Sequence, residues 1–406
     1  MKFLIALSFL YSFTLVSTAL QAQPWQFASP IPVTEAAKEG VFHHLESAGR
    51  RNIAVSGHTV AVAWEDDRDG IPRIYLSRKL VDATAFDHGI LISDKGEAYE
   101  PGLISLGDGY FAVAWEEDGR VYARIAGPDD PGPVYQVSGT LSAQVSMALM
   151  HDRLLLVIRE QPQQFGRIVL HELKVEDRLK LSPVNNCAVD PVPPDDDQLY
   201  PVISVVNERV VVAWEDRRHG HTIIMANQSQ PGKVCAFEPP ARISEKPPQD
   251  RTVIYGTGHG VARVALANYG QQGLYAVWAD KRNFQEGYDI YGAEKQGGQT
   301  FGANVRVQDD FGGNYRQWHS TVTGRPDGRL VAAWADERDG NMDIWYSWLE
   351  DGEWSEDFPL PGASGPGVQY HPSIVMDESG NLHAVWIERE TVGGPSRIFY
   401  LFGAPG

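Results

Sequence analysis

Hydrophobic residues recur along the chain in short runs that lead into an aromatic position and then into acidic residues. The first run, residues 60–66, contains Trp64 at its fifth position, and close copies of it return through the rest of the chain. The seven copies span residues 60–66, 111–117, 154–160, 210–216, 274–280, 330–336 and 382–388, and the third carries Ile158 in place of Trp. Neighbouring copies of this position lie 43 to 64 residues apart. Such a period is typical of repeated four-stranded units.

Each repeat predicts four short strands. An apolar segment such as residues 372–376 comes first, and a turn leads into the Trp strand. A polar turn such as residues 336–340 then opens an aromatic strand such as 343–347, and a fourth strand, as at residues 90–93, closes the unit. The chain shows no helical periodicity. This pattern predicts an all-β, seven-bladed β-propeller with four antiparallel strands per blade.

The seventh repeat has no fourth strand of its own. Fourth strands are expected near residues 90, 134, 180, 243, 306 and 359, which serve the first six repeats. The segment 25–33, ahead of the first repeat, can supply the missing strand. The N-terminal strand would then complete the last blade and close the ring without an exposed sheet edge. We therefore predict that residues 23–406 form a single domain.

Residues 1–22 have the features of a secretory signal peptide. They contain one basic residue, Lys2, then an apolar run too short to span a bilayer, and then small residues. No later stretch approaches the roughly 20 apolar residues of a membrane helix. We expect a periplasmic or secreted protein that is monomeric and does not insert into a membrane.

Charge and cysteine content give two further expectations, one about nucleic-acid binding and one about a disulfide. A formal charge of −18 argues against binding of nucleic acid. Cys187 and Cys235 are the two cysteines, and an oxidising compartment favours a disulfide between them. Because they flank the fourth repeat, the bridge is expected to staple one blade.

A W-x-[DE]-x-R-x-G motif follows several Trp strands. One instance is Trp64, Asp66, Arg68 and Gly70, and others begin at Trp214 and Trp334. A catalytic pair is needed once, whereas this motif recurs. We therefore expect a structural role, in which the Trp packs between sheets, the Gly permits the turn, and Asp and Arg form ion pairs and satisfy loop amides.

The positions at which the repeats differ are better candidates for function. The starts of the predicted innermost strands should line the mouth of the central channel, on the face that carries the loops after the Trp strands. The candidate ligand-binding residues there are His43, His44, Glu100, Tyr200, His259, Trp318, His319, Tyr370 and His371. Imidazole, phenol and carboxylate groups suit either acid–base chemistry or a divalent metal ion, for which His259, His319 and His371 are the candidate ligands. Polar residues around a water-filled channel mouth are the alternative interpretation.

The strings at residues 278–291 and 333–345, with Trp-x-Asp-x-Arg followed by Asp-Ile-Tyr or Asp-Ile-Trp, resemble the repeats of sialidase-like (BNR-type) bacterial propellers. The resemblance covers essentially the whole predicted domain and is one of repeat style. In the family that it resembles, catalytic sialidases use an arginine triad, a Tyr–Glu pair and an Asp acid. This chain departs from them, because strict Asp boxes are absent, the string nearest to the Arg-Ile-Pro motif is Ile71-Pro72-Arg73, and sialidases have six blades.

Two functional hypotheses follow. The first is a non-catalytic exported propeller that binds a glycan, a metal ion or a protein partner on its His-rich channel face. The alternative is a carbohydrate-active enzyme, either a polysaccharide lyase with His/Tyr acid–base chemistry or a divergent sialidase-like glycosidase with paired carboxylates. Seven-bladed exported propellers include such lyases and also lectins, and this likeness concerns the fold.

Overall fold

The computed structural model describes residues 23–35, 38–45, 49–94, 96–218, 221–245, 260–282, 287–298, 300–309 and 315–406. The predicted signal peptide and the candidate residue His259 lie outside these ranges. The described residues form 32 strands and no helix, so they contain no helix that could cross a membrane. The prediction of an all-β protein is confirmed.

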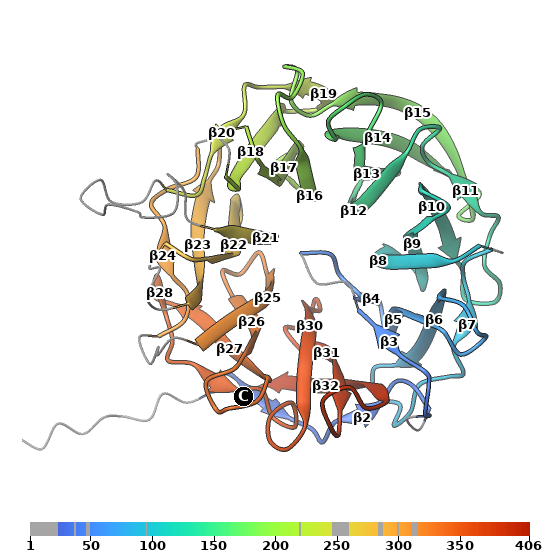
Figure 1. Ribbon diagram of the computed structural model, residues 1–406, viewed down its shortest axis with the longest axis vertical. Helices are drawn as coiled ribbons and strands as arrows, with labels where there is room; N and C mark the ends of the chain where they lie inside the picture. The colour runs from blue at the N-terminus through green and yellow to red at the C-terminus, as the bar shows by residue number, and fades with distance from the viewer. Residues whose placement is uncertain are drawn as a thin grey trace, which may run out of the picture.

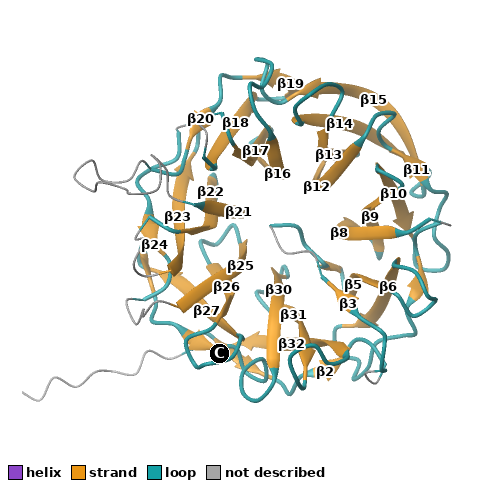
Figure 2. Ribbon diagram, in the orientation of Figure 1, coloured by secondary structure: helices purple, strands orange, loops and turns teal. Residues whose placement is uncertain are grey.

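The sheets stand side by side around a central axis, and each directs one strand toward the centre (Figure 1). Strands and loops alternate around the whole ring (Figure 2). The first four sheets comprise β3 (His43–His44), β4 (Ile53–Ser56), β5 (Thr59–Asp66), β6 (Arg73–Leu80) and β7 (Ile90–Leu91); β8 (Ala98–Gly107), β9 (Tyr110–Glu117), β10 (Arg120–Ala126) and β11 (Tyr135–Gln136); β12 (Ser142–Met150), β13 (Arg153–Glu160), β14 (Arg167–Glu176) and β15 (Lys180–Ala188); and β16 (Gln198–Val206), β17 (Arg209–Asp216), β18 (Ile223–Gln230), β19 (Lys233–Phe237) and β20 (Ala241–Arg242).

The next sheet has nine strands and contains two antiparallel meanders. Its strands are β21 (Val261–Tyr269), β22 (Gly273–Asp280), β23 (Gly287–Gln296), β24 (Val305–Arg306), β25 (Tyr315–Gly324), β26 (Leu330–Asp336), β27 (Asp343–Glu350), β28 (Glu353–Trp354) and β29 (Phe358–Pro359). The meanders β21–β24 and β25–β29 are joined by a parallel pairing of β23 with β25, in which Gly287 lies opposite Tyr315 and Tyr288 opposite Arg316.

The two ends of the described chain meet in the last sheet. It contains β30 (Val368–Met376), β31 (Leu382–Arg389) and β32 (Ser396–Pro405), together with β1 (Trp25–Phe27) and β2 (Ile31–Pro32). Strand β1 runs antiparallel to β32, with Trp25 opposite Pro405 and Phe27 opposite Gly403. The predicted closure of the last sheet by the N-terminal strand is therefore present, and it covers an edge that would otherwise be open.

The core lies between neighbouring sheets. Trp334 of β26, for example, is fully buried and clusters with Ala265, Tyr275 and Val277 of the preceding meander. Its indole Nε1 donates a hydrogen bond of 2.9 Å to Oδ2 of Asp336. The same 2.8 to 2.9 Å bond links Trp64, Trp115, Trp214 and Trp278 to the carboxylate two residues later.

The arginine of the repeated motif binds the carboxylate that accepts the Trp hydrogen bond. Arg338 donates its backbone N–H to Oδ1 of Asp336 at 2.9 Å and its guanidinium to Oδ2 at 2.7 Å. Arg68 and Arg218 make the corresponding bonds to Asp66 and Asp216. Each buried carboxylate is thus neutralised and its loop amide is satisfied, which confirms the structural interpretation of this motif.

The predicted disulfide is present, but it does not staple one blade. Cys187 lies in β15 and Cys235 in β19, so the bridge joins two neighbouring sheets at their outer strands. The Cα atoms are 5.8 Å apart, within the ordinary range for a disulfide. The sequence expectation was wrong because Cys187 lies within β15, the outer strand of the third sheet, whereas Cys235 lies in β19, an outer strand of the fourth.

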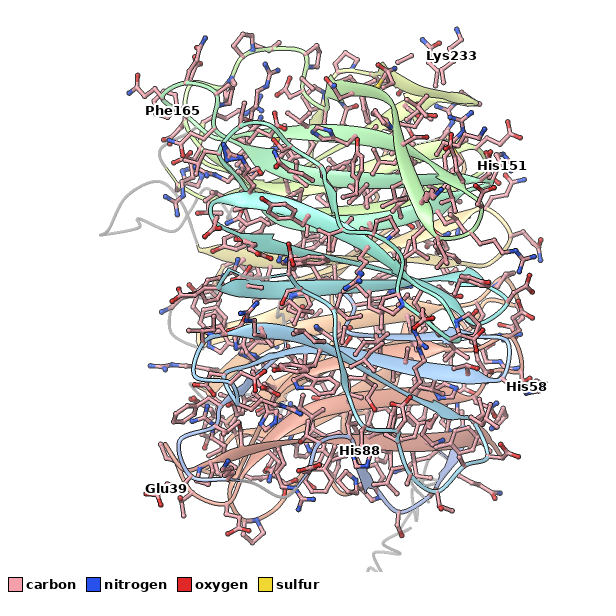
Figure 3. All side chains as sticks on the ribbon, turned by 90° about the vertical axis from the view of Figure 1, so that its right-hand side faces the viewer. Glu39, His58, His88, His151, Phe165 and Lys233 are labelled. Atoms are coloured by element: carbon pink, nitrogen blue, oxygen red, sulfur yellow. A yellow bond between two sulfur atoms is a disulfide. The ribbon has the colours of Figure 1, made fainter. Side chains whose placement is uncertain are left out.

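The molecule has two distinct faces. In the side view, His58 and His151 lie on one side, and Phe165 lies on the other (Figure 3). His58 and His151 occupy turns from inner to second strands, whereas Phe165 lies in the loop after the second strand β13. Inner strands therefore begin on the side of Phe165, which we call the bulge face, and end on the side of His58, which we call the turn face.

Candidate functional site

Six inner strands share an irregularity at the same place near their starts. Strands β8, β12, β16, β21, β25 and β30 each carry a β-bulge at which the register with the second strand shifts. The first bulge residue in each adopts the left-handed region, with φ from 49° to 60°, and these residues are Glu100, Gln144, Tyr200, Arg263, His319 and His371. Left-handed backbone is costly for non-glycine residues, and such strain clusters at functional sites. All six side chains are half-buried, so a ring of varied polar groups surrounds the channel mouth on the bulge face.

In the first sheet, two short strands, β3 and β4, pair with β5 in place of one bulged inner strand. Residues 49–52 of this segment lie at the centre of the ring. Gly49 lies so close to the inner strand β21 that a Cβ atom at this position would be 2.4 Å from the Val264 carbonyl oxygen. Asn52 is fully buried and donates its amide to the carbonyl oxygens of Ala63 and Pro101. We call residues 49–52 the plug, because they lie inside the channel against the inner strands.

Three imidazoles meet beside the plug. The ring of His371 lies 4.2 Å from that of His319 and 5.0 Å from that of His44, measured between centroids. Burial lowers the pKa of all three, to about 4 for His319 and well below the usual range for His371. The three rings are therefore neutral at pH 7, and a neutral imidazole has a nitrogen lone pair that can accept a proton.

The tautomer of His371 follows from its hydrogen bond. Nδ1 lies 2.9 Å from the carbonyl oxygen of Leu45. A carbonyl can only accept a hydrogen bond, so Nδ1 carries the proton and Nε2 holds the lone pair. His371 is thus oriented as a base that acts through Nε2.

Arg263 places a cation beside these neutral rings. Its guanidinium carbon lies 3.2 Å from the centroid of the Tyr200 ring, and its charge contributes to lowering the pKa of both His319 and His371. Its backbone N–H donates to Oε1 of Glu215 at 2.8 Å. Nη1 is buried and has no hydrogen-bond partner among the described residues. The guanidinium therefore has one donor that the described residues leave unsatisfied.

Tyr370 supplies a protonated hydroxyl next to the imidazoles. Its ring centroid lies 4.8 Å from that of His371, and its hydroxyl oxygen accepts a 2.6 Å hydrogen bond from Nε of Arg389. Burial raises the pKa of Tyr370, so the phenol keeps its proton at neutral pH.

Carboxylates occupy the other half of the channel mouth. Glu65 accepts the backbone N–H of Glu100 at 3.1 Å, and Glu116 accepts that of Gln144 at 2.5 Å. Each bond ties one sheet to the bulge of the next. Burial raises the pKa of Glu65 and of Glu116 to about 7. Arg50 of the plug contacts Glu100 at 3.1 Å and Glu116 at 3.8 Å.

The raised pKa of Glu116 predicts a pH-dependent stability. The folded protein keeps a proton that the unfolded chain releases above about pH 4.5, so the free energy of unfolding falls as the pH rises from about 4.5 to 7. Gln cannot ionise. We expect E116Q to gain about 2 to 3 kcal/mol over the wild type between pH 5 and pH 8, measured by urea unfolding. The exposed Glu378 is the control, and an E116Q difference as flat with pH as that of E378Q would contradict the assignment.

Two cavities open on the bulge face around this constellation. One, of about 440 Å³, is lined by His44, Glu100, Glu116, Tyr99 and other residues. The second, of about 650 Å³, is lined by residues that include His319, Tyr370 and Tyr315. Arg389 lines both cavities, and we call the two together the bulge-face trough. His44 lines the first cavity and His319 the second, whereas His371 and Arg263 line neither, and His371 contacts both of these rings.

The sequence-predicted residues that the structure describes fall into three groups. His44, His319, His371 and Tyr370 come together, and Glu100 and Tyr200 lie at other positions of the ring. His43 is buried against Ser396 and Asp66, and Trp318 packs against Tyr288 at a centroid distance of 4.2 Å. His259 lies outside the described residues, so the candidate metal triple stays a prediction. Among the residues described, no three His, Cys, Asp or Glu side chains are arranged to hold a metal ion.

The sequence analysis did not identify Arg263, Glu65, Glu116 and Glu215. A spacing rule could have found Arg263, because all six bulge residues lie 14 or 15 residues before the Trp-equivalent position of the next strand. His259 lies 19 residues before Trp278, whereas Arg263 lies 15 before it. The bulge position of this strand is therefore Arg263. Glu65, Glu116 and Glu215 each directly follow a Trp of the repeat. Because they recur with the structural motif, the sequence analysis did not consider them as site residues.

No protein-family model matches the sequence, and no curated protein matches it. Solved structures with similar folds include a protein of unknown function from Dyadobacter fermentans (TM-score 0.57, 12% identity, 95% of this chain and 100% of that one). The polysaccharide lyase Uly1 is also similar (TM-score 0.56, 9% identity, 89% and 91% coverage). A puromycin-hydrolyzing peptidase of Mycobacterium tuberculosis matches 93% of this chain but only 54% of its own (TM-score 0.54, 13% identity). At these identities the likeness concerns the fold, which is that of a propeller, and no match supports the sialidase-like family.

Proposed function

We propose that the chain binds a uronate-containing polysaccharide in the bulge-face trough and cleaves it by β-elimination. The observation that carries the proposal is the neutral His371 imidazole, with its Nδ1–H bound to a carbonyl, beside the cationic Arg263. Elimination next to a uronate needs a base for the C5 proton, a cation for the carboxylate and an acid for the leaving oxygen. This observation supports the enzymatic hypothesis and, within it, the lyase.

Each role falls to a separate side chain. His371 Nε2 takes the C5 proton, the C4–O glycosidic bond breaks, and a C4–C5 double bond forms. Tyr370 gives its hydroxyl proton to the leaving oxygen, since its raised pKa keeps it protonated. Arg263 pairs with the uronate carboxylate and stabilises the negative charge that develops as the C5 proton leaves.

The trough fits a chain of sugars. The two cavities share Arg389, and Phe42, Tyr99 and Tyr315 expose aromatic rings along them. Aromatic rings offer apolar faces to sugars, while the carboxylates and arginines can bind hydroxyl groups. The structural likeness to Uly1 agrees with this proposal at the level of the fold.

Arg263 tests the substrate class. We expect R263M to weaken binding of polyuronate oligosaccharides by about ten- to a hundredfold, because a charge-assisted pair with the carboxylate is lost. Binding of a neutral oligosaccharide should be as weak in the variant as in the wild type. Isothermal titration calorimetry measures both.

R178M is the matched control, since Arg178 also lies over a tyrosine ring, that of Tyr110, but outside the trough. Equal affinity of R263M and wild type for polyuronate would argue against a role for this guanidinium in binding uronates.

We further infer that the two meanders of the nine-stranded sheet are separate blades, which gives seven in all. The seven Trp-type repeats support this count, and a crystal structure would test it. We also propose that the protein is periplasmic or secreted, which the Cys187–Cys235 disulfide supports. A mature N-terminus near residue 23 by intact-mass measurement is the expected result, and retention of residues 1–22 would contradict it.

A further inference from the structure

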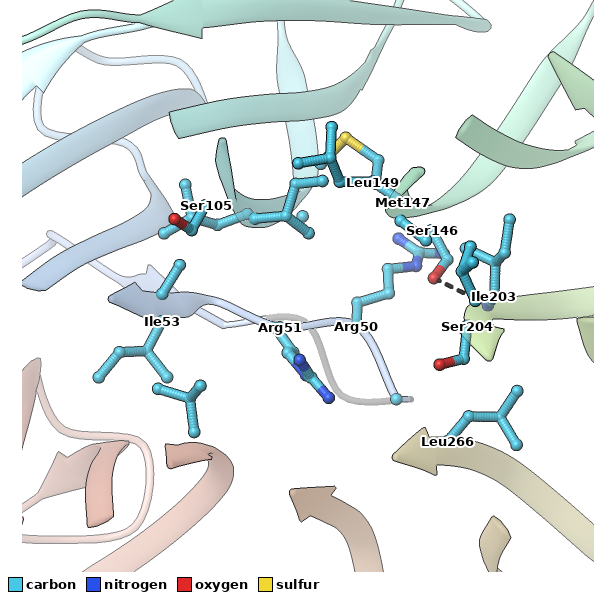
Figure 4. A pocket seen from close by; sticks show the side chains of 18 of the residues that line it. Arg50, Arg51, Ile53, Ser105, Ser146, Met147, Leu149, Ile203, Ser204 and Leu266 are labelled. Atoms are coloured by element: carbon cyan, nitrogen blue, oxygen red, sulfur yellow. Dashed lines mark hydrogen bonds between the residues drawn. The ribbon is translucent and has the colours of Figure 1, made fainter. Parts of the chain in front are cut away.

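The channel contains a third cavity on the other side of the plug. It has a volume of about 330 Å³ and is lined by the inner strands and by Arg51 (Figure 4). Ser105, Val205 and Asn268 of its wall lie five residues beyond the bulge positions of their strands. Because the inner strands run from the bulge face to the turn face, this cavity lies toward the turn face.

The plug fixes the arginine of this cavity in place. The backbone oxygen of Arg51 accepts the N–H of Leu103 at 2.7 Å, and the neighbouring Asn52 is anchored to two carbonyl oxygens. Arg50 contacts Glu100 and Glu116, whereas Arg51 extends into the open centre away from it (Figure 4). The side chains of the two consecutive arginines thus point to different parts of the channel.

The cavity is positive in an otherwise acidic protein. Its lining contains two arginines and no Asp or Glu, while the whole chain has a net charge of −18. No hydrogen bond or ion pair joins the Arg51 side chain to another described residue, and burial lowers its pKa. A guanidinium that is held in a confined space without a counter-charge favours an anionic ligand.

Hydroxyl donors stand around the same space. Ser105 Oγ accepts the N–H of Gly107 at 3.2 Å, and Ser146 Oγ accepts that of Ile203 at 3.4 Å. Neither hydroxyl hydrogen is donated to another described residue, so both are available to a ligand. A guanidinium fork with hydroxyl donors is the donor set that binds phosphate or carboxylate oxygens.

We propose that this turn-face cavity binds a small oxyanion, either inorganic phosphate or the carboxylate of a small organic acid, with Arg51 as its cation and Ser105 or Ser146 as a hydroxyl donor. The volume suits a small molecule and not a polymer. The site is separate from the bulge-face trough and does not depend on the function proposed for it.

The test is calorimetric titration of the purified chain with phosphate and, separately, with acetate at constant ionic strength. We expect saturable binding of at least one of them at one site, weakened about ten- to a hundredfold in R51Q and less in S105A. The exposed Arg178→Gln variant should bind as the wild type does. Stronger binding of phosphate or of acetate identifies the source of the oxyanion.

Saturable binding that is equal in wild type and R51Q would overturn the proposal, as would its absence for both anions. Glu46, outside the described residues, is the acidic residue nearest to Arg51 in the sequence. Binding to E46Q alone, and not to the wild type, would likewise overturn it. If R51Q does not fold, the S105A/S146A double variant must show the loss.

Discussion

Replacement of His371 by alanine is expected to lower kcat on a polyuronate by about 10²- to 10⁴-fold, because the group that removes the C5 proton is lost. The melting temperature should change little, since His371 is half-buried and its ring makes one hydrogen bond, to Leu45. The initial rate of formation of the unsaturated product, followed by ultraviolet absorbance, measures the effect.

The pH dependence of the activity is a second test, because a purely structural role of His371 would not affect it. Burial lowers the pKa of His371 well below 6.5, so the base form and the activity should persist as the pH falls through 6.5, and they should be lost only in more acidic solution. H58A is the matched control, because His58 lies on the turn face (Figure 3). Turnover in H371A within a few-fold of that in H58A would remove His371 from the mechanism.

Replacement of Trp334 by alanine is expected to lower the free energy of unfolding by about 3 to 5 kcal/mol. The indole is fully buried between two meanders, and its loss opens a cavity that the surrounding Ala265 and Val277 cannot fill. The substitution also removes the hydrogen bond from Nε1 to Asp336. Urea unfolding of variant and wild type measures the difference.

Trp345 provides the control, since it is half-buried and lies under the guanidinium of Arg338 at 4.2 Å. W345A should lose clearly less stability than W334A. A cost below 1 kcal/mol for W334A would contradict the role of the repeated Trp as the packing residue between sheets.

The repeat pattern predicts the strands well because neighbouring sheets pack against each other in the same way around the ring. Each Trp is buried against the next sheet and bonded to the carboxylate two residues later, and six of the seven copies carry this pair; the third has Ile158 in place of the Trp. The closing strand could also be predicted, because the last repeat lacks a partner that the segment around Trp25 supplies.

The site is less visible in the sequence, because it depends on backbone geometry within the inner strands. A bulge residue with positive φ aims its side chain differently from its neighbours, so the choice between His259 and Arg263 rests on one register position. The disulfide was misassigned for a similar reason. The path of the outer strands β15 and β19, and not the order of the repeats, decides which sheets the cysteines join.

The most direct test of the proposed function is digestion of a polyuronate in ¹⁸O-labelled water, with mass spectrometry of the products. We predict a new terminus that is unsaturated, that is lighter than a hydrolysis product by one water, and that contains no ¹⁸O, since elimination consumes no water. Products that carry one ¹⁸O at the cleaved bond would show hydrolysis and contradict the elimination. Intact polymer after prolonged incubation would contradict cleavage of polyuronates altogether.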